Sequence, residues 1–141
     1  MTPVKAVIRN GRFVNKTPDA ISYHMHLEDS KRLSKLQAMY RKYAIVYGLR
    51  SNIDNRIYIG SSLTPGLRFH HHLITASRSN FNLQAAIAEH GLENFTALVY
   101  AKFEWNRNDY EGTKKFLLQQ EQLIMDQFPR EQLFNTNKAV A

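Results

Sequence analysis

Two residues one helical turn apart give the first chemical clue in this sequence. The segment RFHHHL places Arg68 and His72 four positions apart, and on a helix such residues share one face. A guanidinium is a planar fork that matches a phosphate, and an imidazole can carry a proton near neutral pH. Three adjacent histidines point about 100° apart on a helix, so they cannot close together on one ion. We therefore do not expect a trihistidine metal site here, and the face shared by Arg68 and His72 is the feature to explain.

A carboxylate interrupts an apolar stripe near the C-terminus. In YEGTKKFLLQQEQLIMDQF, Leu117, Ile124 and Phe128 share one helical face, and Glu121 lies on the same stripe. A buried carboxylate is costly unless it is paired or binds a metal. Glu121 is therefore a candidate metal ligand. The alternative is a glutamate at the edge of the stripe that reaches solvent.

Two tyrosines lie eleven positions apart in two β-rich runs. Tyr47 belongs to AIVYGL and Tyr58 to RIYIG, and the turn sequence SNIDN separates the runs. In a hairpin both side chains can project to the same face, where their hydroxyls would serve one site. The alternative reading, core aromatic residues, is the one that the tyrosines alone favour.

The elements that must position these residues follow from capping and periodicity. Thr64 and Pro65 predict the start of a helix that runs to about Ala76. A second helix follows a cap at Ser79 or Asn80 and stops at Gly91. A strand over 94–105 and a long helix over 110–128, ended by a proline, complete a β-β-α-α-β-α order. This order predicts an α+β fold with a small three-stranded antiparallel sheet flanked by helices.

The first 42 residues are expected to form a basic N-terminal arm and one amphipathic helix. Residues 1–26 show little periodicity and are interpreted as extended or irregular. Residues 29–43 place apolar side chains at helical spacing after a cap at Asp29 or Ser30. The opposite face of this helix is basic, and it is either a nucleic-acid-binding surface or an ordinary solvated face.

Composition narrows the class of partner. The chain has 141 residues, no cysteine and a formal net charge of +7. Such a charge favours a polyanion, and nucleic acid is the first expectation; the alternative is a merely basic soluble protein. Without cysteine there is no disulfide or cysteine-based zinc site, and no secretory signal is evident. No apolar run is long enough to predict a membrane span.

Taken together, these residues resemble the GIY-YIG nuclease family. Its second signature triad is intact as Tyr58-Ile59-Gly60, and the first corresponds to Ile45-Val46-Tyr47, with isoleucine in place of glycine. Arg68 stands ten residues after Tyr58, where the family has its catalytic arginine. His72, Glu121 in LLQQEQLIMD and Asn135 in LFN match later positions of the pattern. The resemblance covers residues 43–137 and leaves 138–141 as a tail.

The resemblance implies a metal-dependent DNA endonuclease. It implies that Glu121 binds Mg²⁺ or Mn²⁺, that Arg68 binds the phosphate, and that Tyr47 is the general base or positions the water. His72 would share that proton or hold the phosphate, Tyr58 would orient water or substrate, and Asn135 would brace the site. Expected nucleic-acid contacts are made by Arg68, His71, Arg78 and Lys102. Trp105 could stack on a base or lie in the core.

SNFNLQAAIAEHGLENF is also similar to the corresponding segment of homing endonucleases encoded within group I introns. This likeness implies duplex DNA as substrate and an organelle, mitochondrion or chloroplast, or a phage-infected bacterial cytoplasm as location. No DNA-binding repeat follows the catalytic segment. The alternative hypothesis is therefore a catalytically retired domain that binds RNA or a ribonucleoprotein, such as an organellar ribosome.

Overall fold

The fold is a four-stranded antiparallel sheet with helices on both faces. The computed structural model describes residues 8–9, 12–13, 18–105 and 107–136. In the sheet the strand order is β3 (Ser22–His24), β6 (Phe95–Phe103), β4 (Ala44–Ser51) and β5 (Ile57–Ser62). β5 is thus one edge of the sheet and β3 the other. Two further strands, β1 (Ile8–Arg9) and β2 (Arg12–Phe13), pair only with each other.

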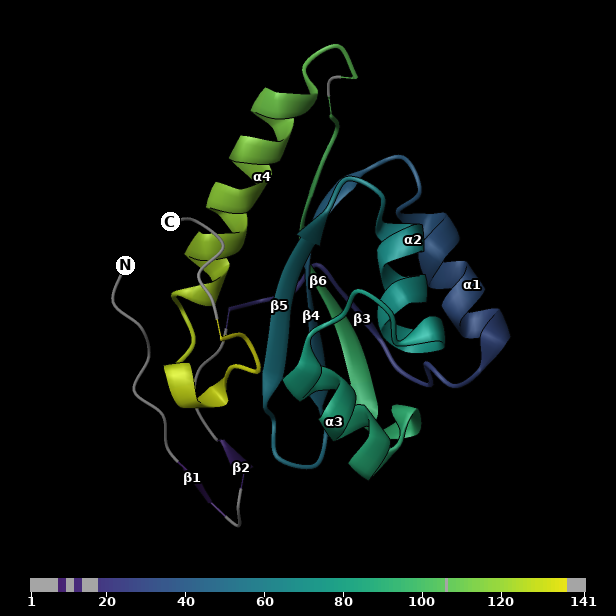
Figure 1. Ribbon diagram of the computed structural model, residues 1–141, viewed down its shortest axis with the longest axis vertical. Coiled ribbons are helices and arrows are strands. Elements are labelled where there is room, and N and C mark those ends of the chain that lie inside the picture. The colour runs from purple at the N-terminus through teal and green to yellow at the C-terminus, as the bar shows by residue number, and fades with distance from the viewer. Residues whose placement is uncertain (1–7, 10–11, 14–17, 106, 137–141) are drawn as a thin grey trace.

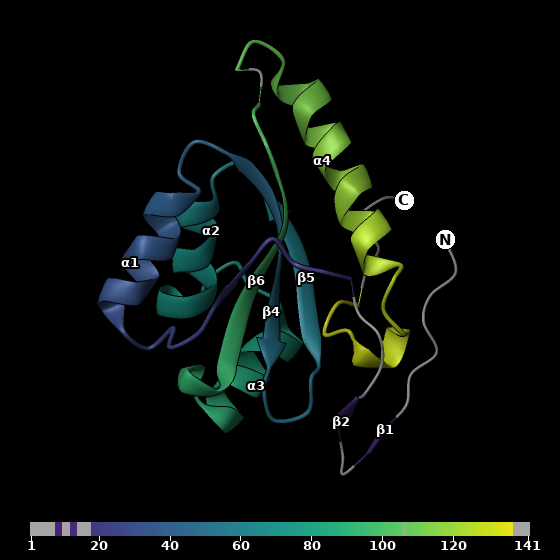
Figure 2. The ribbon, with the colours of Figure 1, turned by 180° about the vertical axis from the view of Figure 1, so that it is seen from behind.

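Three helices cover one face of the sheet and one long helix covers the other (Figures 1 and 2). The first group is α1 (Ser30–Met39), α2 (Pro65–His70) and α3 (Phe81–His90). The opposite helix is α4 (Tyr110–Met125). Short turns complete the chain: a π-helical turn η1 (His71–Thr75) and two 3-10 turns, η2 (Leu92–Asn94) and η3 (Arg130–Gln132).

The predicted α+β class and the element order from β4 to α4 agree with this architecture, but the prediction of three strands is wrong. The additional strand, β3, comes from the arm that was expected to be extended or irregular, and it pairs with β6. With three residues it is too short to show an alternating pattern. Its outward residue Tyr23 is exposed, whereas Ser22 turns inward and bonds to Tyr40. In this strand the polar Ser22 faces inward and the aromatic Tyr23 faces solvent, which is the reverse of an ordinary half-buried strand.

Alternation along β4 divides the core into two layers. Ile45, Tyr47 and Leu49 pack with the helices α1 to α3, in a cluster that includes Leu36 and Phe69. Val46 and its neighbours on the other face pack against Leu117, Met125 and Phe128 of α4 and of the turn after it. Because both faces of β4 are covered, almost every residue of this strand is buried. The sheet centre is therefore a rigid support for side chains that project from it.

Helix ends lie close to the predicted positions because capping residues set them. Asp29 accepts a hydrogen bond from the backbone N–H of Lys31, and Asn80 accepts one from Leu83. Asp109, which was not singled out, caps α4 through the N–H of Gly112. α4 ends at Met125 rather than at 128, and a turn then leads to Pro129. Residues directly before a proline disfavour the helical conformation, which explains the earlier end.

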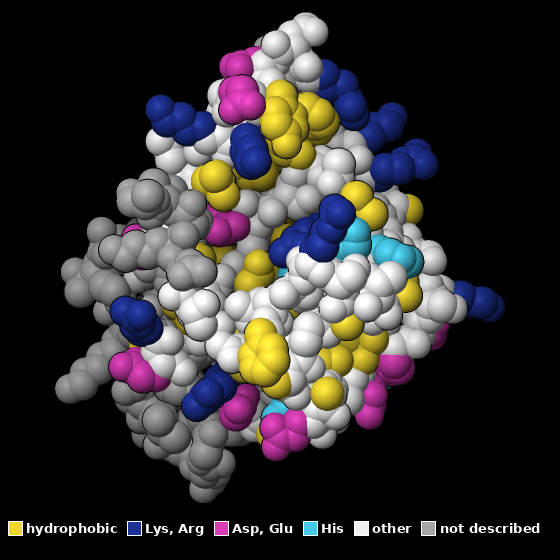
Figure 3. Space-filling model, viewed as in Figure 1, with side chains coloured by type: hydrophobic (Ala, Val, Ile, Leu, Met, Phe, Trp, Pro, Cys, Tyr) yellow, Lys and Arg dark blue, Asp and Glu magenta, His cyan; other side chains and the backbone are white. Residues whose placement is uncertain are grey.

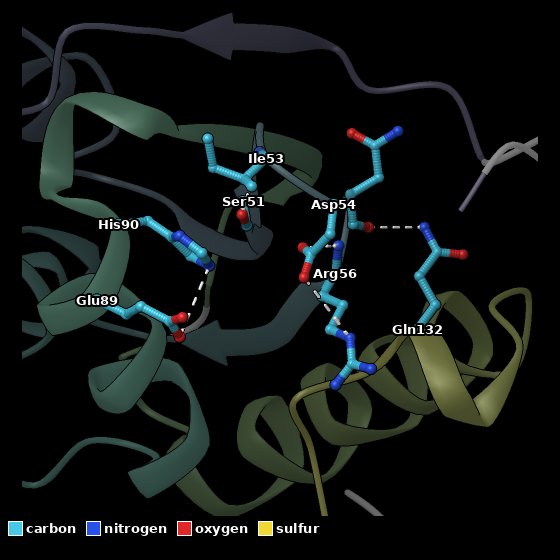
Figure 4. A network of polar contacts seen from close by, with 8 residues as sticks. Ser51, Ile53, Asp54, Arg56, Glu89, His90 and Gln132 are labelled. Carbon is cyan, nitrogen blue, oxygen red and sulfur yellow. Dashed lines mark hydrogen bonds and ion pairs between the residues drawn. The ribbon is translucent and has the colours of Figure 1, made fainter. Parts of the chain in front are cut away.

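The turn between β4 and β5 is fixed from two sides (Figure 4). Within the turn, Ser51 Oγ accepts from the N–H of Ile53, and Asp54 accepts from the N–H of Arg56. From outside, the Gln132 amide donates to the carbonyl oxygen of Asn55. The hairpin is therefore tied to the C-terminal segment, which also pairs with β5 through a parallel bridge between Ile57 and Leu133. In the described part of the chain, no helix combines the length and apolarity needed to cross a bilayer.

Candidate active site

Most of the predicted site residues form one cluster, at the place where the side chain of Tyr47 passes over the edge strand β5. Tyr47 on β4 faces Gly60 on β5 in the antiparallel register. A Cβ at position 60 would lie 2.6 Å from Tyr47 Oη, closer than side-chain carbons approach. Glycine is therefore required at this position of the YIG triad, because the tyrosine ring occupies the space above it. Ser61 and Ser62 follow, so this end of β5 is lined by small residues.

His72 binds the Tyr47 hydroxyl and is itself held from behind. Its Nε2 lies 2.7 Å from Tyr47 Oη, and its Nδ1 lies 2.6 Å from Ser79 Oγ. Gln84 of α3 donates one amide hydrogen to Ser79 Oγ and lies in bonding distance of the His72 carbonyl oxygen, both at 2.8 Å. A neutral imidazole has one donor and one acceptor nitrogen, so the chain of bonds runs in one direction at a time. The local π-helical turn η1 carries His72, and such turns often occur at functional sites.

Arg68 brings positive charge to the two tyrosine hydroxyls. It lies on α2, one turn before His72, and its guanidinium donates to the backbone carbonyl of Arg78. The half-buried guanidinium also interacts with the hydroxyls of Tyr47 and Tyr58. Hydrogen bonding and charge from Arg68 oppose the rise in the pKa of Tyr58, and they act in the same direction on Tyr47. Arg68 is therefore the cation that acts on both phenols.

Glu121 reaches the same place from the opposite face of the sheet. It lies on α4 between the buried residues Leu117 and Met125 and is itself only 9% exposed. The Ser61 hydroxyl donates a hydrogen bond of 2.7 Å to its carboxylate. Among the described residues no ion pair within 4 Å neutralises Glu121. The glutamate thus belongs to the buried stripe, and it does not reach out to solvent at its edge.

Burial dominates the electrostatics of the cluster. It raises the pKa of Tyr47 well above its ordinary value, and the neighbouring Tyr58 adds to this rise. Burial, followed by the charges of Arg68 and His71, lowers the pKa of His72 to about 3, so the imidazole is neutral at physiological pH. Burial also raises the pKa of Glu121, against the opposing effects of Ser61 and Arg68. A cation beside the carboxylate would therefore stabilise its charged form.

The donor set suits a hard, mostly hydrated cation. The described residues contain no group of three or more His, Cys, Asp or Glu side chains that could hold a metal ion. One buried carboxylate beside a serine hydroxyl is a sparse set, but Mg²⁺ keeps several of its waters and commonly takes one or two carboxylates. Zinc sites use three or four protein ligands, which this cluster does not offer. Glu121 therefore fits Mg²⁺ or Mn²⁺ as the sole charged ligand.

Asn135 lies beside the cluster and holds its strand in place. Its amide donates to the Ile59 carbonyl oxygen at 2.7 Å, and its own oxygen accepts from the Ile59 N–H at 2.9 Å. The side chain thereby imitates a neighbouring β-strand along the free edge of β5. Because Ile59 lies between Tyr58 and Gly60, this pair of bonds fixes the backbone that carries the second tyrosine.

The remaining residues expected to contact nucleic acid are more dispersed. Figure 3 shows Lys and Arg side chains with histidines beside a hollow in the surface between α2 and α4. His71 is half-buried in η1, and Arg78 is exposed in the loop before α3. Lys102 lies over the Tyr43 ring, at 4.8 Å from the Nζ atom to the ring centre, and lines a separate cavity beside the start of α4. Trp105 is half-buried and stacks with Arg107.

Three residues in the cluster were not predicted from the sequence. The sequence marks Ser79 only as a possible helix cap and marks neither Ser61 nor Gln84 as a site residue. A signal for Ser61 was present, because it continues the alternation of Ile57 and Ile59 and so must face α4. No comparable local signal exists for Gln84, whose contacts depend on the packing of α3 against η1.

Comparison of the chain with protein-family models, with curated proteins and with solved structures finds no match. The description of the fold and of the cluster therefore rests on the geometry of this structure alone.

Proposed function

We propose that this chain is a divalent-metal-dependent endonuclease that hydrolyses phosphodiester bonds in DNA. The observation that carries the proposal is the meeting, at one end of β5, of three chemically different groups from both faces of the sheet. These groups are a buried carboxylate, a guanidinium and a hydroxyl–imidazole pair. Phosphodiester hydrolysis can use all three. The carboxylate would bind a metal, the guanidinium would hold the phosphate and the hydroxyl–imidazole pair would accept the proton of the attacking water.

Glu121 is the residue that would hold the metal. Mg²⁺ or Mn²⁺ bound there would supply Lewis acidity toward a phosphate oxygen and the leaving oxygen. Ser61 keeps the carboxylate oriented by donating to one of its oxygens. Because Ser61 is a neutral partner, it leaves the negative charge of the carboxylate for the cation.

Arg68 would hold the scissile phosphate. Its planar fork matches two phosphate oxygens, and a fixed cation stabilises charge that develops during attack. In the free protein, the guanidinium lies beside the tyrosine hydroxyls. Pairing with a phosphate draws it away from them. The pairing also removes one of the causes that lower the pKa of His72, which makes the imidazole a better proton acceptor.

Tyr47 and His72 would together remove the proton from water. The Tyr47 hydroxyl donates to Nε2 while Nδ1–H donates to Ser79, a direction that the neutral imidazole permits. As the water oxygen attacks phosphorus, its proton passes to Tyr47 and the phenolic proton passes to His72. The bond from phosphorus to the leaving oxygen breaks, and that oxygen takes a proton from solvent. Tyr58, half-buried beside Arg68, orients the water or substrate.

A duplex substrate and an intron-encoded, homing type of enzyme are the finer parts of the proposal. They rest on the net charge of +7 and on the family resemblance. One cluster serves one strand at a time, so a single chain would nick a duplex before a second event cuts the other strand.

One observation favours a second candidate, a domain that binds nucleic acid without cutting it. Tyr47 is 0% exposed, so its hydroxyl meets water only after a neighbouring side chain moves. A retired nuclease within a larger assembly, such as an organellar ribosome, would keep the basic surface and need no such movement.

Supercoiled plasmid separates the two candidates. The purified chain is incubated with plasmid and Mg²⁺ or Mn²⁺, and with EDTA in a parallel reaction. The endonuclease proposal predicts relaxed or linear product with either metal and none with EDTA. Salt-sensitive DNA or RNA binding with intact supercoiled plasmid would favour the retired binding domain instead.

A further inference from the structure

A second surface lies at the other edge of the sheet, between β3 and α1. This groove has a volume of about 440 Å³. Its strand side carries two large apolar residues that are mostly exposed, Tyr23 at 58% and Met25 at 55%, and its helix side carries Met39 at 48%. Adjacent exposed apolar side chains of this size commonly mark a binding surface.

The helix side of the groove is basic. Arg32, Lys35 and Met39 follow one another at spacings of three and four, so they line one side of α1. No acidic residue occurs from position 30 to position 53, and no carboxylate lines the groove. Both cations are exposed, so they can turn toward a ligand. The groove therefore combines an aromatic ring and two thioethers with cationic side chains, and no anionic side chain lines it.

The floor of the groove is fixed and uncharged. His24 lines it and bonds through Nε2 to Ser22 Oγ at 2.9 Å, and Ser22 Oγ in turn lies 2.5 Å from the Tyr40 hydroxyl. The His24 ring packs edge-on against Tyr40, with 6.3 Å between ring centres. Burial lowers the pKa of His24, so the ring is neutral at physiological pH. Charge in the groove therefore comes from α1, while the strand side offers aromatic and apolar surface.

We propose that this groove binds a single-stranded segment of nucleic acid, with a base stacked on Tyr23 and phosphates on Arg32 and Lys35. Proteins that bind single strands combine a positive groove for the backbone with aromatic rings for the bases. A double helix keeps its bases paired and stacked inside, so a base in a duplex cannot stack on the Tyr23 ring in this groove. An acidic peptide would be attracted by the cations but would leave the exposed Tyr23 ring without a function.

The groove is a site separate from the Glu121 cluster. β3 and β5 are opposite edges of the sheet, and α1 contacts α2 through a hydrogen bond from Gln37 to the Gly66 carbonyl. Nucleic acid held in the groove could therefore continue around α1 toward the helix that carries Arg68 (Figure 2). Because binding here needs neither metal nor cleavage, the proposal can fail or succeed independently of the nuclease function.

Fluorescence anisotropy of a labelled dT12 oligonucleotide tests the proposal, with the full chain in EDTA so that cleavage cannot interfere. The double variant Arg32→Ala/Lys35→Ala is expected to bind at least about fivefold more weakly, with a salt slope smaller by about 1.4. Tyr23→Ala should also weaken binding about fivefold or more, and Tyr23→Phe should restore it. The matched control Arg41→Ala/Lys42→Ala removes two exposed cations that follow α1 and do not line the groove, and it should change affinity less than twofold.

Three results would overturn the proposal. The first is equal loss of affinity in both double variants, which would mean that the surface attracts anions without a site. The second is dT12 binding unchanged by Tyr23→Ala, with a polyglutamate peptide displacing the oligonucleotide equally well from both proteins, which would indicate an acidic-peptide surface. The third is a blunt duplex binding more tightly than dT12 and losing affinity in the groove variants. Circular dichroism of each variant ensures that only folded proteins are compared.

Discussion

The Tyr47 hydroxyl lies 2.7 Å from Nε2 of His72, although the two residues are 25 positions apart in the chain. One comes from the centre of the sheet and the other from a π-helical turn, and both are almost completely buried. A fully buried polar pair of this kind needs a reason, because each group loses its hydration. The proposed reason is proton transfer, with Ser79 setting the direction of the chain of hydrogen bonds.

Burial of neutral His72 predicts a particular pH dependence of stability. Its pKa falls to about 3 in the folded protein from about 6.5 in the unfolded chain. Below pH 6.5 the unfolded state binds a proton that the folded state refuses, so stability falls as pH falls, by at most about 1.4 kcal/mol per pH unit for this group. Urea unfolding at pH 7, 6 and 5 should show a flatter dependence for His72→Gln. Parallel profiles for both proteins would mean that His72 is not held neutral.

Ser79→Ala tests whether the hydrogen bond to Nδ1 sets the direction of proton transfer. Without Ser79 Oγ, the imidazole can place its proton on Nε2 and then donate to Tyr47, which blocks the proposed transfer. We expect a tenfold or greater loss of kcat with KM little changed, and partial rescue in Ser79→Thr, which keeps a hydroxyl. ¹⁵N chemical shifts of the His72 ring should show a change in the protonated nitrogen. An unchanged tautomer together with an unchanged kcat would remove Ser79 from the mechanism.

Glu121→Gln is expected to stabilise the metal-free protein at neutral pH. Burial raises the pKa of Glu121 in the folded state, so the charged form is less favourable there than in the unfolded chain. The stability contributed by this group is present at low pH and is lost as pH rises through the unfolded and then the folded pKa. The amide can still accept the bond from Ser61. We expect Tm at pH 7.5 to rise by about 2 °C or more in EDTA, with the difference shrinking toward pH 4.

The same pair of proteins reports on metal binding without any cleavage. A cation that binds only the folded state stabilises that state by RT ln(1 + [L]/Kd), so Tm rises with the cation concentration. Millimolar Mg²⁺ or Mn²⁺ should raise the Tm of the wild-type protein, and the shift should disappear in Glu121→Gln. An equal shift in both proteins would place the cation elsewhere.

Asn135→Ala should loosen the edge strand that carries the YIG triad. It removes two hydrogen bonds to Ile59 and leaves that backbone without its partner, a loss of about 1–3 kcal/mol. Asn82→Ala is the matched control, since it removes one 3.2 Å bond to the same C-terminal segment from an exposed position. Chemical denaturation should show a clearly smaller effect for Asn82→Ala. Equal effects would mean that Asn135 does not brace β5.

The helices and the central strands could be predicted because their signals are local. Asp29, Asn80 and Pro65 mark helix starts in the sequence, and the structure has helices that begin beside them. β3 could not be predicted, since an edge strand of three residues is defined by its partner β6 and not by its own pattern.

The candidate site residues are marked in the sequence by a different signal. Spacing predicts that Arg68 and His72 share a face, and the interrupted stripe singles out Glu121, because each of these signals spans only a few helical turns. The sequence does not distinguish Ser79 and Gln84 as site residues, because polar residues near a helix start are common. Their role depends on the contact between α3 and η1, which no short-range pattern encodes.

The initial rate of plasmid nicking in Mg²⁺ by four single variants tests whether the Glu121 and Arg68 cluster is the active site. Glu121→Gln and Arg68→Ala change the cluster, while Glu111→Gln and Arg41→Ala remove the same charges from exposed positions on α4 and after α1. We expect the first two variants to lose at least about a hundredfold in rate and the two controls to stay within twofold of wild type. Nicking that survives Glu121→Gln, or that falls equally in the cluster and control variants, would contradict the assignment of this cluster as the active site.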